Sequence, residues 1–146
     1  MSEMETFKIK TTLQEGIQVK AEGRGHEVIM DEPKSLGGTD TGLNPVEMVL
    51  TGLGGCLSIC AGMFAKSCNV KLNNFYVDIE GDLDFRGFKG DKEVDPGFQD
   101  IRFTIHVDSD SPEENIKKLI ELIEARCPVS DTLQRKMNVK GDFVID

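Results

Sequence analysis

The stretch GLNPVEMVLTGLGGCLSICAGMF, residues 42–64, decides the fold of this chain. Asn44 followed by Pro45 is a helix start signal, because an asparagine side chain caps the first turn and proline suits the first helical position. Apolar residues then recur at helical spacing: Val49, Leu53, Cys56, Cys60 and Met63. The pattern predicts one long central helix that begins at Pro45 and ends near Asn69.

Three glycines, Gly52, Gly54 and Gly55, stand in this helix just before Cys56. Each costs roughly 1 kcal/mol relative to alanine in a helix interior, so local helix stability does not explain them. A bare helix surface lets another helix pack closely. Because apolar residues also face several directions, one small domain covers this helix poorly, and we predict a homodimer.

The rest of the chain predicts an α+β fold in a single domain, residues 1–146, with the order βββ-α-ββ-αα-β. The predicted strands are residues 6–13, 17–22, 26–30, 74–83, 100–108 and 138–146. A helix over residues 112–126 buries Ile116, Leu119, Ile120 and Ile123, and Pro128 starts another. The glycine-rich connection 84–98 is longer than a hairpin needs, which suggests a functional loop or an edge feature.

Composition excludes several classes of partner. With 26 acidic and 17 basic residues the net charge is −9, which repels nucleic acid and anionic lipid. The first ten residues lack the apolar run of a secretory signal, and we expect no segment to reach the length of a membrane span. We therefore expect a cytoplasmic protein whose thiols are kept reduced.

Two of the four cysteines stand where thiol chemistry is conceivable. Cys127 directly precedes the helix that Pro128 starts, where unpaired N–H groups favour a thiolate; the alternative is a weak cap at a helix kink. Cys56 lies three turns into its helix, so its activation would require a neighbouring charge. Its alternative is a small core residue, which also describes Cys60. Cys68 at the helix end is a bystander.

A metal site is the competing interpretation of these cysteines, and the spacing argues against it. The chain has no C-x-x-C pair, and its only histidines are His26 and His106. His106 lies in an alternating strand, which is typical of a surface or cross-strand residue. We therefore expect no metal and no bound cofactor.

Four segments together resemble the OsmC/Ohr family of thiol-dependent peroxidases over about residues 26–139. They are NPVEMVLTGLGGC, ARCPVSDTL, DEPKSLGG and VDPGFQDIRFTIHVDSD. The resemblance implies an OsmC-like fold and a cytosolic, intertwined homodimer with two active sites at the subunit interface. It also gives the glycines a second role, access of a peroxide to the thiol.

By this resemblance Cys56 is the peroxidatic residue, which attacks an organic hydroperoxide and becomes a sulfenic acid. Cys127 is the resolving residue, which condenses with it to a disulfide. An external dithiol such as a lipoylated protein then reduces the disulfide. Two alternatives remain open: a non-catalytic small-molecule-binding protein with vestigial thiols, and a sulfur-transfer protein with a persulfide at Cys56.

The chain is similar to the OsmC-like branch rather than to Ohr. Ohr-type members carry an arginine near the first hairpin and a glutamate ten residues before the reactive cysteine, whereas this hairpin tip, residues 14–16, holds no arginine and Glu47 lies nine before Cys56. Nine helical residues span about 13 Å and half a turn, so a supporting Glu47 would have to reach the thiol of the other subunit. Its alternative role is to close the cap with Asn44.

Overall fold

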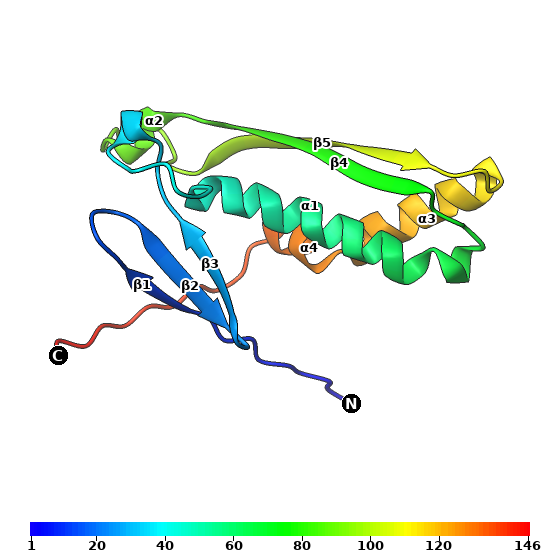
Figure 1. Cartoon of the computed structure of the whole chain (residues 1–146), viewed down its shortest axis with the longest axis horizontal. Helices are drawn as coiled ribbons and strands as arrows, with labels where there is room; N and C mark the ends of the chain where they lie inside the picture. Colours follow the sequence, from blue (N-terminus) through cyan, green and yellow to red (C-terminus); the bar gives the residue numbers. More distant parts are fainter. The chain divides into compact units, whose positions relative to one another are not determined.

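The computed structural model describes residues 1–146, which form two compact units, 1–49 and 50–146; each is described by itself. The strands are β1 Lys10–Leu13, β2 Val19–Gly23, β3 His26–Met30, β4 Asn74–Leu83 and β5 Phe98–Asp108. The helices are α1 Pro45–Phe64, α2 Phe85–Phe88, α3 Glu113–Arg126 and α4 Pro128–Gln134, with 3-10 turns η1 Lys34–Leu36 and η2 Lys66–Cys68. Figure 1 labels these elements along the chain.

The N-terminal unit is an antiparallel sheet of three strands in the order β1-β2-β3, as predicted. Gly16 in the first turn has a φ of +65°, which glycine adopts without steric cost. The apolar side chains of this unit are poorly covered within the chain: Phe7 is 86% exposed and Ile9 69%. This sheet therefore has no complete core of its own.

Asp31 organises the loop that leads from β3 to α1. It is 2% exposed, and its carboxylate accepts hydrogen bonds from the Thr39 hydroxyl at 2.6 Å and the Thr41 hydroxyl at 2.7 Å. The backbone N–H of Glu32 donates to the same carboxylate at 2.8 Å. These bonds, that of Thr39 above all, hold the pKa of Asp31 well below its usual range. The loop is thus closed around one ionised carboxylate.

Helix α1 begins at Pro45 as the sequence predicts, but it ends at Phe64, before the predicted end near Asn69. The Asn44 side chain accepts a hydrogen bond from the Glu47 backbone N–H at 2.8 Å, the interaction of a helix N-cap. The turn η2 follows, and Asn69 ends it in the left-handed conformation with φ 55°. That conformation is common where helices terminate.

Helix α1 also corrects the expectation that no segment reaches the length of a membrane span. Its 20 residues are long and apolar enough by length and composition. Length and composition do not separate a spanning helix from the core helix of a folded domain. Leu53 and Leu57 are buried in one cluster with side chains from β4, β5 and α3, while only 22% of the apolar window is buried within the chain.

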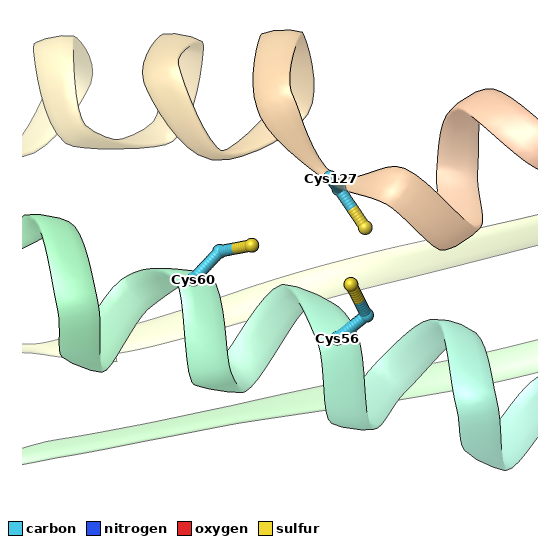
Figure 2. A group of neighbouring side chains, drawn as sticks. All are labelled: Cys56, Cys60 and Cys127. Carbon is cyan, nitrogen blue, oxygen red and sulfur yellow. The ribbon is translucent and has the colours of Figure 1, made fainter. Parts of the chain in front are cut away.

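The C-terminal unit is a two-layer arrangement. Strands β4 and β5 pair antiparallel along their length, with Val77 opposite Ile105 and Ile79 opposite Phe103. Figures 1 and 2 show α1 and the α3–α4 pair side by side on one face of this ribbon. The buried residues of the core are Leu53, Leu57, Cys60, Ala61, Ala65, Val70, Leu119, Ile123 and Cys127. Of the predicted buried stripe of α3, Leu119 and Ile123 are buried, and Ile116 and Ile120 are partly buried against this cluster.

The three glycines of α1 face different surroundings. A Cβ added to Gly54 would lie 2.6 Å from Cδ1 of Ile79, so Gly54 allows α1 to approach β4 closely. A Cβ on Gly52 or Gly55 would meet nothing within 4 Å. Gly54 is explained by packing within the chain, whereas the other two leave a bare exposed surface.

The predicted last strand, residues 138–146, is wrong for this chain: no regular structure follows α4. The side chains of this tail are exposed, including Val139 at 87% and Phe143 at 81%. A strand needs a neighbour that pairs with its backbone N–H and C=O groups, and no strand of this chain pairs with the tail. The other predicted strands are confirmed to within a few residues, and the connection 84–98 contains the short helix α2.

Candidate active site

Three cysteine sulfurs meet between the helices of the C-terminal unit. Cys56 and Cys60 lie one turn apart on α1, and Cys127 lies at the junction of α3 and α4. The three Sγ atoms lie within 4.8 Å of one another. In Figure 2 the sulfurs of Cys56 and Cys127 point toward each other across the gap, and that of Cys60 points into the same gap. All three are free thiols in this structure.

The two predicted residues, Cys56 and Cys127, are therefore brought together as the sequence suggested. A disulfide requires a sulfur separation of about 2 Å, and rotation of cysteine side chains can close a gap of this size when the backbones are near. Sequence reasoning missed the third thiol, Cys60. The available signal was its position four residues after Cys56, which places both on one helix face.

Cys127 caps helix α4, as its place before Pro128 predicts. Its backbone N–H donates to the Ile123 carbonyl at 3.0 Å, and its Sγ accepts from the Ser130 N–H at 3.4 Å. The residue is only 1% exposed. Burial raises the pKa of the Cys127 thiol, and the Ser130 N–H only partly offsets this. Of the two interpretations of this position, the structure favours the cap, because desolvation of the thiol outweighs the N–H groups at the start of a seven-residue helix.

Exposure distinguishes the three thiols. Cys60 and Cys127 are buried, and burial raises the pKa of Cys60 as well. Cys56 is only partly buried. A small molecule from solution therefore reaches Cys56 first, while Cys127 is positioned to meet whatever forms there.

No arginine of the C-terminal unit pairs with these thiols. Arg102 binds Glu80 and Asp82, and the guanidinium of Arg126 lies over the Phe64 ring at 5.7 Å from its centroid. The remaining two bind Asp84 and Asp131. The cluster packs among apolar side chains, and the arginines of this unit are engaged elsewhere.

A pocket of about 670 Å³ opens on the same layer of the unit. Leu53, one turn before Cys56, and Ser130, the hydrogen-bond partner of Cys127, both line it. Phe98, Ile101 and Phe103 supply an apolar wall from β5. Phe98 comes from the end of the long 84–98 connection, which gives that segment a structural role at the pocket. Its size is that of small-molecule sites, and its lining is mixed, because Gln99, Asp100, Glu124 and Gln134 also border it.

The cysteine cluster is also the one place in this unit where sulfur ligands for a soft metal ion converge. A trigonal ion with metal–sulfur bonds near 2.3 Å places its sulfurs about 4 Å apart, which this cluster accommodates. A fourth ligand is missing. His106 stacks on Tyr76 at 4.3 Å between ring centroids and bonds Asp78 at 3.0 Å, which confirms it as a cross-strand residue.

Glu47 is not brought to the thiols by its own helix. It is exposed in the first turn of α1, and its backbone N–H is held by Asn44. Nine residues separate it from Cys56 by about 13 Å along a continuous helix, on the opposite side. Its predicted supporting role is therefore not assembled within a single chain.

Comparison with protein-family models matches the OsmC-like protein family over residues 38–141. The chain belongs to the OsmC-like family. This match covers most of the chain and includes all three clustered cysteines. The OsmC-like fold predicted from the sequence is therefore confirmed, including the long central helix that carries Cys56.

Curated OsmC-like relatives carry an enzymatic name. The chain is 28% identical over 141 residues to a hydroperoxide reductase of Mycoplasma genitalium, which covers 92% of this chain and 91% of the relative. It is 25% identical over 138 residues to a hydroperoxide reductase of Mycoplasma pneumoniae, with the same coverage of 92% and 91%.

A solved structure supports the fold. The OsmC-like protein from Mycoplasma pneumoniae superposes with a TM-score of 0.77 at 24% sequence identity, covering 89% of this chain and 88% of that one. At this identity the likeness concerns the fold alone.

Proposed function

We propose that this protein is a thiol-dependent peroxidase that reduces organic hydroperoxides through a disulfide between Cys56 and Cys127. The observation that carries the proposal is the meeting of a partly exposed thiol with a buried one, their sulfurs within 4.8 Å. The hydroperoxide reductase names of the relatives support the same reaction class.

In the first step the Cys56 thiolate attacks the terminal oxygen of a hydroperoxide, ROOH. The O–O bond breaks, Cys56 becomes a sulfenic acid, and the leaving alkoxide takes a proton and departs as the alcohol ROH. Cys56 suits this step because it is the clustered thiol that solution reaches. The apolar wall of the adjoining pocket suits an organic R group better than hydrogen peroxide.

In the second step the Cys127 thiol attacks the Cys56 sulfur. The S–O bond breaks, the hydroxyl leaves as water with the thiol proton, and a disulfide forms. Burial of Cys127 suits this role, because a buried thiol is protected from direct oxidation by peroxide and meets only its neighbour.

The cycle closes when an external dithiol reduces the disulfide and is itself oxidised to a cyclic disulfide. The sum of the steps converts ROOH and a dithiol into ROH, water and a disulfide, with no metal or bound cofactor. A lipoylated protein is a dithiol of this class, and a reducing cytoplasm is the compartment that maintains one.

The proposal includes a homodimer. The sheet β1–β3, the glycine surface of α1 and the C-terminal tail all leave apolar groups exposed in the single chain. Exposed apolar surface of this extent is typical of an interface. In a dimer the Glu47 of the second subunit could support the Cys56 thiol. Glu47 of the same chain cannot do so, because the continuous helix holds it about 13 Å away on the opposite side.

The test is hydroperoxide consumption with a dithiol reductant, measured for cumene hydroperoxide, a fatty-acid hydroperoxide and hydrogen peroxide. We expect turnover with the organic substrates, none in Cys56→Ser, and consumption of about one equivalent without turnover in Cys127→Ser, which stops at the sulfenic acid. Cys68→Ser is the matched control, since Cys68 lies outside the cluster, and it should turn over like the wild type. Wild-type inactivity toward all three peroxides would refute the proposal.

A further inference from the structure

Cys60 has no part in the two-thiol cycle, yet its sulfur lies within 4.8 Å of both sulfurs that do. It is one turn beyond Cys56 on α1 and is 6% exposed. Figure 2 shows its sulfur directed into the gap that Cys127 also faces. A thiol beside a disulfide is a potential nucleophile for thiol–disulfide exchange.

Geometry decides which bonds Cys60 can form. Residues four apart on a helix have Cβ atoms about 5–6 Å apart, whereas a disulfide needs about 3.5–4.5 Å, so a Cys56–Cys60 bond would distort α1. Cys127 comes from a different element and faces both. It is therefore the shared partner of two alternative disulfides, one with Cys56 and one with Cys60.

We infer that Cys60 is a third redox residue, which moves the disulfide from Cys56–Cys127 to Cys60–Cys127 and so returns Cys56 to the thiol state. This inference rests on the proposed function, since the first disulfide is its starting point. The Cys60 thiolate attacks the Cys127 sulfur, the Cys56–Cys127 bond breaks, and Cys56 leaves as a thiolate that takes up the proton Cys60 lost. The exchange is an isomerisation that needs no oxidant or reductant.

The exchange moves the disulfide from a partly exposed cysteine to a buried pair. The Cys60–Cys127 disulfide joins two buried residues, 6% and 1% exposed, so an external dithiol reaches it poorly. Cys56 is partly exposed and is again free to attack a second hydroperoxide. The chain thereby takes up about two equivalents of peroxide before it needs reductant, where a two-thiol site takes up about one. Reduction follows the reverse exchange. The Cys56 thiolate attacks the Cys127 sulfur, Cys60 leaves as a thiolate, and the external dithiol reduces the Cys56–Cys127 disulfide that results.

The test is peroxide stoichiometry without reductant, followed by peptide mapping. Fully reduced protein receives one equivalent of cumene hydroperoxide, then a second together with dimedone, which traps sulfenic acids. For the wild type we expect consumption of about two equivalents, a Cys60–Cys127 disulfide and dimedone on Cys56. For Cys60→Ser, and for Cys60→Ala if the serine disturbs the core, we expect about one equivalent, a Cys56–Cys127 disulfide and no dimedone on Cys56.

Cys68→Ser controls for the remaining cysteine and should behave as the wild type does. A wild type that consumes about one equivalent and carries only Cys56–Cys127 would overturn the exchange while leaving the peroxidase intact. Wild-type and Cys60 variants that consume no peroxide at all would overturn the proposed function, and the exchange with it.

Discussion

The two units of this chain differ in how completely they bury their apolar side chains. The C-terminal unit has a core in which Leu57, Leu119 and Ile123 are fully buried; Cys60 and Cys127 belong to it, and Cys56 packs partly buried against it. The N-terminal sheet leaves Phe7 and Ile9 largely exposed, and no strand of the chain pairs with the tail after α4. One chain thus brings the three thiols together, and the exposed apolar groups of the N-terminal unit and the tail are the surface that the proposed dimer would cover.

The largest difference between the two units should be in the free energy of unfolding that is lost when an apolar side chain is truncated. Ile123→Ala removes a fully buried side chain and should lower the free energy of unfolding by about 2–5 kcal/mol. Chemical denaturation measures this. The matched change in the other unit, Ile9→Ala, should cost about 0.5 kcal/mol or less if its side chain stays as exposed as in the single chain. A large loss from Ile9→Ala would mean that an interface covers it.

Assembly should depend on the apolar tail. Because Phe143 is 81% exposed in the single chain, Phe143→Asp should leave the C-terminal unit folded and weaken a dimer by about tenfold or more. Sedimentation at low micromolar concentration checks this against the wild type. A wild type that sediments as a 16.1 kDa species would refute the dimer.

Gly54 and Gly55 of α1 should respond differently to substitution, because Gly54 packs against Ile79 and Gly55 faces no other part of the chain. Gly54→Ala places a Cβ against Cδ1 of Ile79, an overpacking cost of about 1–3 kcal/mol that a gain of about 1 kcal/mol in helix propensity partly offsets, so the net loss should be about 2 kcal/mol or less. Gly55→Leu meets nothing in the chain and improves helix propensity, so it should impair assembly or turnover rather than helicity. Circular dichroism and sedimentation distinguish the two; an active, dimeric Gly55→Leu protein would show that the bare surface is unnecessary.

The smallest effect should come from the loop carboxylate of the N-terminal unit. The hydrogen bonds that lower the pKa of Asp31 stabilise its ionised form, so their contribution is complete above the unfolded pKa of about 4 and is lost as the pH falls below it. Asp31→Asn should lower the thermal midpoint at pH 7, and this deficit should shrink on acidification. A deficit that stays constant down to pH 3 would show that ionisation of Asp31 is not what holds the loop.

Local signals in the sequence predicted the elements that a single chain can satisfy. Asn44 and Pro45 fixed the start of α1, and the alternation in β4 and β5 matched their observed pairing. The strand predicted over residues 138–146 was wrong, because alternating residues indicate a strand but do not indicate which strand would pair with it. The strand pattern is local information, and pairing is not.

The candidate site was predictable in part for the same reason. The two motifs named Cys56 and Cys127, but the convergence of Cys60 on both depends on how α3 packs beside α1. The sequence left the two interpretations of Cys127 open, because its place before a helix is visible in the sequence and the burial that raises its pKa is not.

The central claim is that a partly exposed Cys56 is oxidised first and a buried Cys127 resolves it. Its most direct test is non-reducing peptide mapping of the wild type, quenched within seconds of adding one equivalent of cumene hydroperoxide. The account predicts the loss of two hydrogens per chain and a disulfide from Cys127 to Cys56, or to Cys60 where the exchange has already taken place; in Cys60→Ser it predicts Cys56–Cys127 alone. A disulfide between Cys56 and Cys60, a sulfenic acid on Cys127 in Cys56→Ser, or four unchanged thiols would contradict it.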